Sequence, residues 1–330
     1  MTTRKKRLLL PEEMKTIGWE FLKTRQDVEA IAFPQRIPAA EFRRLLHDVD
    51  GVGLTNTPLR AEDIEAAPRL RVVGRMGAGF DAVDVDLLTR RGIPVMTCGT
   101  DNSPTVAEYT MYMMLALCKR GAEMDTMVRH GRWAERFVDP PTELLGKKLL
   151  IVGFGRIGSR VAKRCLAMEM LVEAYDPYVP AEVVRAAGCE PVSSLDDAVS
   201  RADFVTIHCP KTPETIDLFD AVRIARMKPT ARLINTARGG LVDEVALYAA
   251  LSGGKLAGAG IDVFSPEPPL ADNPLFTLKN VVVAPHLAGN TYESLDRRSL
   301  TTIRNILSVL DGKPNRELVI NPEALRAARA

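Results

Sequence analysis

The sequence predicts an α/β protein with two domains, one of which is inserted into the other. Short apolar segments alternate with helical patterns along most of the chain, which is typical of parallel sheets connected by helices. The length of 330 residues exceeds the roughly 250 residues at which a single hydrophobic core stops growing. After the last strand of the second domain, a helical pattern at residues 291–310 leads away, and we expect residues 316–320 to return as an edge of the first domain.

The first predicted domain comprises residues 1–103 and 294–330 and has a flavodoxin-like α/β fold. Its apolar runs and the periodic segments between them predict a small parallel sheet with connecting helices. Strands are expected at Leu8–Leu10, Val28–Phe33, Gly51–Leu54, Arg71–Arg75 and Pro94–Thr97, and helices at Pro38–Leu46, Arg60–Ala67 and Asp84–Arg91.

The inserted domain is predicted at residues 104–293. Its first helix has Ser103 as a suitable N-cap and Pro104 as a suitable first residue, and apolar residues at helical spacing continue it to about Lys119. The strand count that follows is typical of a doubly wound, Rossmann-type domain. These strands are expected at Leu149–Val152, Leu171–Tyr175, Phe204–His208, Arg232–Thr236, Gly258–Asp262 and Val281–Ala284.

A G-x-G-x-x-G motif joins the first of these strands to a predicted helix. Gly153 permits the tight turn, Gly155 lets the backbone approach a diphosphate, and Gly158 lets the helix pack close to the strand. The free N–H groups at the start of that helix would face the anion. After the next strand, Asp176 is placed to accept hydrogen bonds from a ribose 2′-hydroxyl and would repel a 2′-phosphate. The motif therefore predicts a dinucleotide site, with NAD(H) rather than NADP(H) as the cofactor.

Composition argues against several other classes of protein. The 44 basic and 42 acidic residues give a net charge of +2, so neither a nucleic-acid-binding nor a membrane-binding surface is expected. The basic start at residues 4–7 precedes an apolar run too short for a signal peptide, and no apolar stretch has the length of a membrane span. Five cysteines in scattered apolar segments favour reduced, buried thiols in a cytoplasmic protein over disulfides or a metal site.

Polar residues that can carry chemistry follow successive strands of the inserted domain. Arg238 offers a planar guanidinium that matches a carboxylate. Glu267 lies in a proline-rich loop, and His286 follows the last strand. A histidine paired with a carboxylate can hold or release a proton near neutrality, as reduction of a ketone or oxidation of an alcohol requires. An isolated arginine or histidine usually serves structure, but the three together at strand ends of one dinucleotide-binding sheet indicate a catalytic site.

Two features are open to more than one interpretation. His208 also ends a strand, and a catalytic role and a place in the cofactor wall with Cys209–Pro210 are equally compatible with the sequence. In the first domain, the turn Gly77–Gly79 either presents backbone N–H groups to a small anion such as a carboxylate or is merely a tight turn between a strand and a helix. His47 and His130 are expected at the surface.

Over nearly its whole length the chain resembles the D-isomer-specific 2-hydroxyacid dehydrogenases. The order and spacing of several specific motifs carry this resemblance. These motifs are Gly77–Gly79 with Asp81, Asn102 with Val106–Glu108, Gly153–Gly158, Asp176–Pro177, His208–Thr215, Asn235–Glu244, Leu256–Phe264, Glu267–Pro268 and Pro285–Gly289.

The resemblance implies a role for each matching residue. Arg238 would bind the substrate carboxylate and carbonyl oxygen, and His286, supported by Glu267, would be the acid/base. Asp262 would hold the nicotinamide amide, and the backbone at Ala78–Gly79 would meet the substrate carboxylate. The implied cofactor-binding residues are Val106, Gly153, Gly155, Arg156 and Ile157 (through their backbone), Gly158, Asp176, Pro177, His208, Cys209, Pro210, Thr215, Thr236, Ala237, Arg238, Asp262, His286 and Gly289. The implied substrate-binding residues are Leu54, Arg75, Ala78, Gly79, Arg238 and His286.

The resemblance also implies a homodimer, joined through the nucleotide-binding domain with help from the segment around Arg132–Trp133. A small 2-oxo acid, hydroxypyruvate or glyoxylate, is favoured as substrate. D-3-Phosphoglycerate is the alternative, weakened because Thr55 and Thr57 stand where bacterial phosphoglycerate dehydrogenases carry arginines. Formate dehydrogenases carry glutamine where Glu267 stands, which argues against formate, whereas phosphite oxidation uses a similar residue set and is a further alternative. An NAD-sensing, corepressor-like binding protein is the rival of another class.

Overall fold

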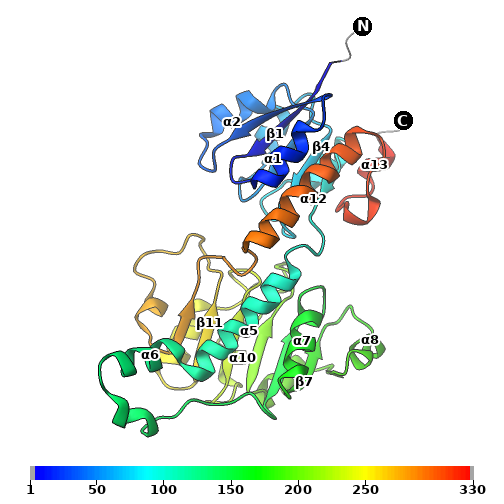
Figure 1. Cartoon of the computed structure of the whole chain (residues 1–330). Coiled ribbons are helices and arrows are strands. Elements are labelled where there is room, and N and C mark those ends of the chain that lie inside the picture. Colours follow the sequence, from blue (N-terminus) through cyan, green and yellow to red (C-terminus); the bar gives the residue numbers. More distant parts are fainter. Residues whose placement is uncertain (1–3, 328–330) are drawn as a thin grey trace. The chain divides into compact units, whose positions relative to one another are not determined.

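The computed structural model describes residues 4–327, which form two compact units. Unit 1 comprises Met1–Asn102 and Asn290–Ala330, and unit 2 comprises Ser103–Gly289. The predicted domain boundaries lie after residues 103 and 293. The observed boundaries lie after Asn102, one residue earlier, and after Gly289, four residues earlier. Residues 1–3 and 328–330 of the predicted first domain lie outside the described residues. Unit 2 is thus a continuous segment, whereas unit 1 is assembled from both ends of the chain (Figure 1).

Unit 1 is built on a five-stranded parallel sheet with the strand order β2-β1-β3-β4-β5. This is the flavodoxin-like order, so the predicted fold class is confirmed for this unit. Each predicted strand is present, and the last is shorter than expected. The strands are β1 (Lys6–Pro11), β2 (Val28–Phe33), β3 (Gly51–Leu54), β4 (Val72–Arg75) and β5 (Val95–Met96).

The long helix α12 (Tyr292–Leu310) packs on β3 and β4 because two glycines leave room for it. A Cβ at Gly51 would lie 2.7 Å from the Ile306 side chain, and one at Gly74 would lie 2.8 Å from it. Helix α1 was not predicted, and it contains Gly18, a poor helix former whose missing side chain makes room for Ile303. The other helices are α1 (Thr16–Lys23), α2 (Ala39–Leu46), α3 (Ala61–Glu65), α4 (Val85–Arg90), η3 (Arg316–Leu318) and α13 (Ala324–Ala327).

The last segment of the chain pairs with the edge of this sheet, as predicted. Thr97 N donates to Leu318 O at 3.0 Å, and Ile320 N donates to Val95 O at 2.8 Å. Met96 and Val319 form an antiparallel bridge between these two hydrogen bonds. The outer side of β5 is therefore covered by residues that lie more than two hundred positions away in the sequence.

Unit 2 contains a seven-stranded parallel sheet with the order β12-β11-β10-β9-β6-β7-β8. The strand order reverses at β6, between β7 and β9, as in Rossmann-type sheets. The predicted fold class is therefore confirmed here as well, and the short β8 is an addition to the predicted strands. The strands are β6 (Lys148–Val152), β7 (Leu171–Tyr175), β8 (Glu190–Pro191), β9 (Phe204–Ile207), β10 (Arg232–Asn235), β11 (Gly258–Ile261) and β12 (Val281–Val283).

Hydrophobic cores lie on both faces of this sheet because successive strand residues point to opposite faces. Along β6, Leu150 and Val152 belong to one core and Leu149 and Ile151 to the other. The predicted helix from Ser103 is confirmed as α5, and its buried methionines pack in the second core. The helices of unit 2 are α5 (Ser103–Lys119), α6 (Gly121–Arg129), η1 (Trp133–Phe137), α7 (Gly158–Ala167), α8 (Ala181–Ala186), α9 (Leu195–Arg201), α10 (Ala221–Ala225), α11 (Glu244–Ser252) and η2 (Pro274–Thr277).

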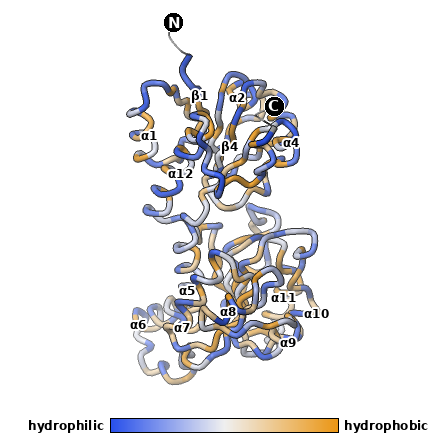
Figure 2. The backbone as a smooth tube through the Cα atoms, turned by 90° about the vertical axis from the view of Figure 1, so that its right-hand side faces the viewer, coloured by the Kyte–Doolittle hydropathy of each residue, from blue (hydrophilic) through white to orange (hydrophobic). Residues whose placement is uncertain are grey.

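The surface helices of both units intersperse hydrophilic and hydrophobic residues along their length (Figure 2). None of the helices in the described part of the chain combines the length and the apolar composition that a membrane span needs. The five cysteines are free thiols, as expected; four are buried, and Cys209 is partly exposed. His47 and His130 are exposed, as predicted.

Candidate active site

The glycine motif of unit 2 forms the turn from β6 into α7. Gly153 has a φ of +97°, and a Cβ there would lie 2.6 Å from the backbone N of Cys209. A Cβ at Gly158 would lie 2.1 Å from the carbonyl oxygen of Gly153, so close backbone packing requires both glycines. At Gly155, in contrast, a Cβ would meet nothing within 4 Å. The turn is therefore closed on its protein side and open at Gly155, which fits the approach of a dinucleotide diphosphate.

Asp176 follows β7 and is held against the glycine turn. Its Oδ2 accepts a hydrogen bond from Phe154 N at 2.8 Å, and its Oδ1 accepts one from Tyr178 N at 2.9 Å. Each carboxylate oxygen can accept more than one hydrogen bond. The position of Asp176 therefore fits the predicted interaction with ribose hydroxyls.

A buried asparagine shapes the turn that carries Arg238. The Asn235 side chain accepts a hydrogen bond from Ala237 N at 3.0 Å and donates one to Arg238 O at 2.9 Å. Arg238 Nη1 donates to Ala237 O at 2.7 Å. A Cβ at Gly239 would lie 1.8 Å from Phe264 O, so the turn also packs directly on the segment that follows β11. Asn235 entered the sequence analysis only as part of a motif, and its structural role there is local: its amide closes the turn.

His286 and Glu267 form the pair that the sequence predicted. His286 Nδ1 lies 2.5 Å from Glu267 Oε1, and the two side chains are 38% and 37% exposed. His286 has a φ of +52°, a left-handed conformation that is uncommon for a non-glycine residue and costs about 1–3 kcal/mol. Because Nδ1 faces the carboxylate, Nε2 is the nitrogen left for exchange of a proton with a substrate.

Asp262 holds the backbone of this histidine turn from inside the protein. His286 N donates to the Asp262 carbonyl oxygen at 2.7 Å, and the buried carboxylate accepts from Leu287 N at 2.7 Å and Ala288 N at 3.0 Å. Burial raises the pKa of Asp262, and the two backbone hydrogen bonds oppose that shift. The carboxylate therefore supports the strained turn, in addition to the nicotinamide contact predicted for it.

His208 lies at the end of β9 in an environment unlike that of His286. Its Nε2 lies 3.0 Å from Thr206 Oγ1, and burial lowers the pKa of His208 to about 3. The imidazole is therefore neutral near pH 7 and is poorly suited to proton transfer there. Of the two interpretations left open by the sequence, this environment favours a place in the cofactor wall.

The other residues predicted to bind the cofactor also belong to unit 2. Thr236 is buried, and its Oγ1 lies 3.0 Å from Thr110 Oγ1 on α5, one turn after the buried Val106. Thr215 Oγ1 donates to Pro210 O at 2.8 Å and so closes the loop after β9. Burial raises the pKa of the Cys209 thiol to about 11, which keeps it protonated. Exposed or partly exposed positions are Arg156, Ile157, Pro177, Pro210, Ala237 and Gly289.

In unit 1, two predicted substrate-binding side chains make contacts within the fold. Leu54 is 0% exposed in the core, so a contact between its side chain and a substrate is not supported. Arg75 is 8% exposed; its Nε donates to Gly79 O at 3.0 Å and its Nη1 to Thr55 O. Arg75 thus ties the glycine turn to the end of β3. A Cβ at Gly77 would meet nothing within 4 Å, so this turn is open on one side, as an anion-binding turn needs to be.

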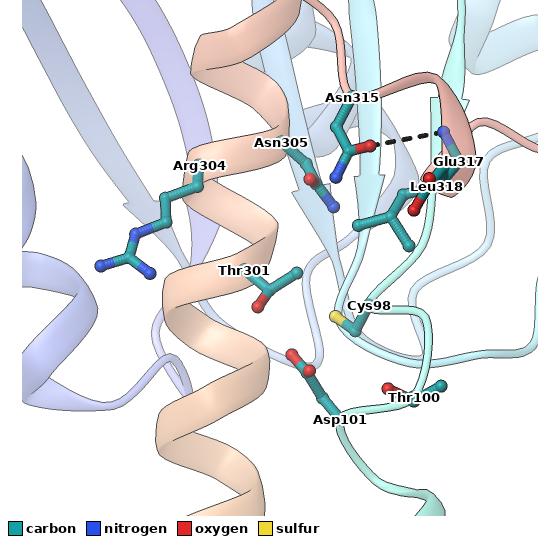
Figure 3. Close-up of a pocket in the computed structure, with 9 residues that line it drawn as sticks. All are labelled: Cys98, Thr100, Asp101, Thr301, Arg304, Asn305, Asn315, Glu317 and Leu318. Atoms are coloured by element: carbon teal, nitrogen blue, oxygen red, sulfur yellow. Dashed lines mark hydrogen bonds between the residues drawn. The ribbon is translucent and has the colours of Figure 1, made fainter.

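A separate cavity of about 350 Å³ lies in unit 1 beside α12, and it includes none of the predicted site residues (Figure 3). Both acidic and basic side chains line it, together with polar uncharged ones: Cys98, Thr100, Asp101, Thr301, Arg304, Asn305, Asn315, Glu317 and Leu318. Among residues 4–327, no group of histidine, cysteine and acidic side chains could hold a metal ion.

Comparison with known proteins places this arrangement in a family. The family model described as "D-isomer specific 2-hydroxyacid dehydrogenase, NAD binding domain" matches residues 111–288, more than half of the chain. The chain belongs to the D-isomer-specific 2-hydroxyacid dehydrogenase family. The resemblance stated from the motifs is thereby confirmed, and NAD(H) is the cofactor of the matched domain, as predicted.

Curated relatives and solved structures agree with this assignment. D-3-phosphoglycerate dehydrogenase of Mycobacterium tuberculosis is 43% identical over 257 residues, which cover 78% of this chain and 48% of the relative. The chain therefore spans about half the length of such relatives. The TT0316 protein from Thermus thermophilus has a TM-score of 0.86 at 32% identity, covering 95% of this chain and 99% of that one. D-lactate dehydrogenase from Aquifex aeolicus, solved with NAD and lactic acid, has a TM-score of 0.84 at 29% identity, covering 95% and 99%.

Proposed function

We propose that the chain is an NAD(H)-dependent oxidoreductase that interconverts a D-2-hydroxy acid and the corresponding 2-oxo acid. Its catalytic residues in this proposal are Arg238, Glu267 and His286. The observation that carries the proposal is the 2.5 Å contact between His286 Nδ1 and Glu267 Oε1, in the same unit as a glycine turn open to a dinucleotide. Membership of the family supports it.

The roles of the three residues follow from their chemistry. Nδ1 of His286 donates its hydrogen to Glu267, so Nε2 accepts the hydroxyl proton during oxidation and returns it to the carbonyl oxygen during reduction. The Glu267 carboxylate stabilises the imidazolium that forms. Arg238 binds the substrate carboxylate with its planar guanidinium and so orients the reacting carbon. When bound, NAD(H) takes up or supplies the hydride.

D-3-Phosphoglycerate is the first candidate substrate. The relatives at 36–44% identity are named D-3-phosphoglycerate dehydrogenase, in bacteria, archaea and a plant. This support outweighs the preference for hydroxypyruvate or glyoxylate that was drawn from the sequence. The chain spans about half the length of these relatives, so their substrate has to be tested directly with this chain.

Hydroxypyruvate or glyoxylate is the second candidate, favoured by residues at the end of β3. Thr55 Oγ1 and Thr57 Oγ1 are inaccessible to solvent and have no hydrogen-bond partner among residues 4–327. Neutral hydroxyls there bind a phosphate dianion less strongly than the arginines of the phosphoglycerate enzymes would. The lack of arginines at these two positions therefore favours a substrate without a phosphate.

A homodimer and a cytoplasmic location complete the proposal. Trp133, Phe137 and Val138 are 61%, 75% and 82% exposed, an apolar concentration that favours a protein–protein interface. The Arg136 guanidinium lies over the Trp133 and Phe137 rings, at 5.2 Å and 4.5 Å from their centroids. Sedimentation of the wild type and of a Trp133→Ala/Phe137→Ala variant tests this interface, and an unchanged mass for the variant contradicts it.

The deciding experiment measures kcat and KM for hydroxypyruvate, glyoxylate, phosphohydroxypyruvate (the oxo form of phosphoglycerate) and phosphite, with NAD(H) and NADP(H) in parallel. Turnover with a 2-oxo acid and NADH supports the proposal, and the preferred acid separates the two candidates. Tight NADH binding without turnover of any acid supports the corepressor-like alternative instead. A higher kcat/KM with NADPH contradicts the role given to Asp176.

A further inference from the structure

Glu244, the first residue of α11, binds two points of the segment that carries Glu267. Its Oε1 accepts a hydrogen bond from Ser265 N at 2.7 Å, and its Oε2 accepts one from Asn273 Nδ2 at 2.9 Å. Both carboxylate oxygens are thus engaged, one on each side of Glu267 in the sequence. The segment from Ser265 to Asn273 is otherwise a loop without helix or strand.

The second of these points is itself well fixed. Asn273 Oδ1 accepts from Leu275 N at 3.0 Å and so caps η2, and Asn273 N donates to Leu270 O at 3.1 Å. Leu275 is 0% exposed in the core of unit 2. Glu244 therefore ties the loop to a residue that is already anchored to the core.

Glu244 also stands next to the turn that carries Arg238. Asp243 caps α11 by accepting from Val245 N at 2.9 Å and Ala246 N at 3.1 Å, which fixes the start of the helix. Glu244 lies six positions after Arg238, and between them Gly239 packs on the carbonyl of Phe264. One short segment thus presents Arg238 and holds the loop of Glu267.

We propose that Glu244 is a positioning residue. Its two hydrogen bonds fix the position of the loop that carries Glu267 and thereby maintain the contact between Glu267 and His286. This inference rests on the proposed function, since it gives Glu244 a role through the acid/base pair. Glu244 itself touches neither the substrate nor the cofactor in this proposal. Its two hydrogen bonds keep Glu267 at the distance at which it supports the protonated histidine.

The variant Glu244→Ala removes both hydrogen bonds, and Glu244→Gln retains an acceptor for only one of them. We expect kcat to fall roughly 10- to 100-fold for alanine and less for glutamine, because sub-ångström errors in catalytic geometry are costly. KM for NADH should stay unchanged, since the glycine turn is not altered. For reduction, in which His286 must hold its proton, the alkaline limb of the pH profile of kcat should move to lower pH, because the imidazolium loses part of its carboxylate support. Asp272→Ala, an exposed carboxylate in the same loop, is the matched control and should change none of these values.

A double-mutant cycle tests whether Glu244 acts through Glu267. In a Glu267→Ala background, Glu244→Ala should change kcat by less than about twofold, since the group that it positions is gone. An equal loss of kcat in both backgrounds overturns the inference and leaves Glu244 a purely structural residue. If Glu244→Ala does not fold, Glu244→Gln or Asn273→Ala replaces it in the same double-mutant cycle, because each removes one of the two hydrogen bonds.

A spectroscopic measurement keeps this test separate from the proposed function. The chain has 4 histidines, so the imidazole signal of His286 can be identified by its loss in His286→Ala. In Glu244→Ala the signal should move toward its position in Glu267→Ala, whether or not the chain turns over a substrate. An unmoved signal refutes the positioning role, whereas a moved signal without turnover of any acid refutes the proposed function alone.

Discussion

The carboxyl ends of the two parallel sheets differ in how their predicted site residues are used. In unit 2, Asp176, Arg238 and His286 each lie in a turn after a strand and are held there by hydrogen bonds. Asp176 accepts from a backbone N–H, the Arg238 carbonyl accepts from the Asn235 side-chain amide, and His286 N donates to a backbone carbonyl. In unit 1, Leu54 is buried in the core and Arg75 binds backbone carbonyls. The residues predicted for cofactor binding and proton transfer lie in turns whose backbone geometry requires particular residue types, so their positions can be predicted from the sequence. Substrate selection depends on which way individual side chains point, and that orientation is set by tertiary packing rather than by the local sequence.

The strongest test of this contrast is removal of the proposed acid/base. His286→Ala should lower kcat by roughly 10²- to 10⁴-fold, the usual contribution of a positioned proton donor. Steady-state kinetics with NADH and the preferred 2-oxo acid measures this loss. His130→Ala, at an exposed position in the same unit, is the control and should retain full activity. Retained activity in His286→Ala would leave unit 2 without its proposed centre.

Arg238 is expected to have the next largest effect. Arg238→Ala should lower kcat/KM roughly 100-fold, about 2.7 kcal/mol of transition-state stabilisation, through both a higher KM and a lower kcat. The guanidinium would bind the carboxylate in the ground state and polarise the carbonyl in the transition state. Arg223→Ala serves as a control at a surface ion pair of the same unit. If neither parameter changes in Arg238→Ala, Arg238 does not belong to the site.

Glycines within one turn allow stability to be separated from cofactor binding. Gly158→Ala brings a Cβ within 2.1 Å of a carbonyl oxygen, so we expect a loss of stability of roughly 1–3 kcal/mol. Gly155→Ala meets nothing within 4 Å and should fold normally, yet it should weaken NADH binding roughly tenfold, ~1.4 kcal/mol. Thermal unfolding and NADH titration measure the two effects. Unchanged NADH affinity in Gly155→Ala would show that the diphosphate does not approach there.

The pH dependence of stability tests whether the imidazole of His208 is held neutral in the folded protein. Burial lowers the pKa of His208 to about 3, and the unfolded chain has the ordinary value of about 6.5. Above pH 6.5 both states are neutral, and as the pH falls toward 3 only the unfolded state gains the proton, so stability is lost. At pH 5 the loss is about 2 kcal/mol. Urea unfolding at pH 7 and pH 5 should show this difference in the wild type and a smaller one in His208→Gln; equal differences would contradict the burial of a neutral imidazole.

How far the sequence predicts this molecule depends on the range of the interactions involved. Glycine sterics and strand-to-helix turns are local, so the motif at Gly153–Gly158 and the alternation of strands and helices follow from pattern. The hydrogen bonds of Glu244 to Ser265 and Asn273 join segments that meet only in the fold, and nothing in the spacing predicts them. Helix α1 escaped prediction because tertiary packing around Gly18 overrides its low helix propensity.

The smallest predicted effect concerns the threonines at the end of β3, and it bears directly on substrate choice. Thr55→Val/Thr57→Val replaces two buried hydroxyls that lack partners among residues 4–327 by methyl groups of similar size. Because an unsatisfied buried hydroxyl is costly, the variant should be equally or more stable, by up to about 1 kcal/mol. A substrate that displaces the atoms covering these hydroxyls gains a hydrogen bond from them, so under the proposal that the end of β3 selects the substrate, KM for the preferred acid rises a few-fold in the variant while kcat and KM for NADH stay constant. Thr230→Val, at an exposed position, is the control. A variant less stable by more than 1 kcal/mol would show that the hydroxyls already have partners such as ordered water, and an unchanged KM would show that the end of β3 does not select the substrate.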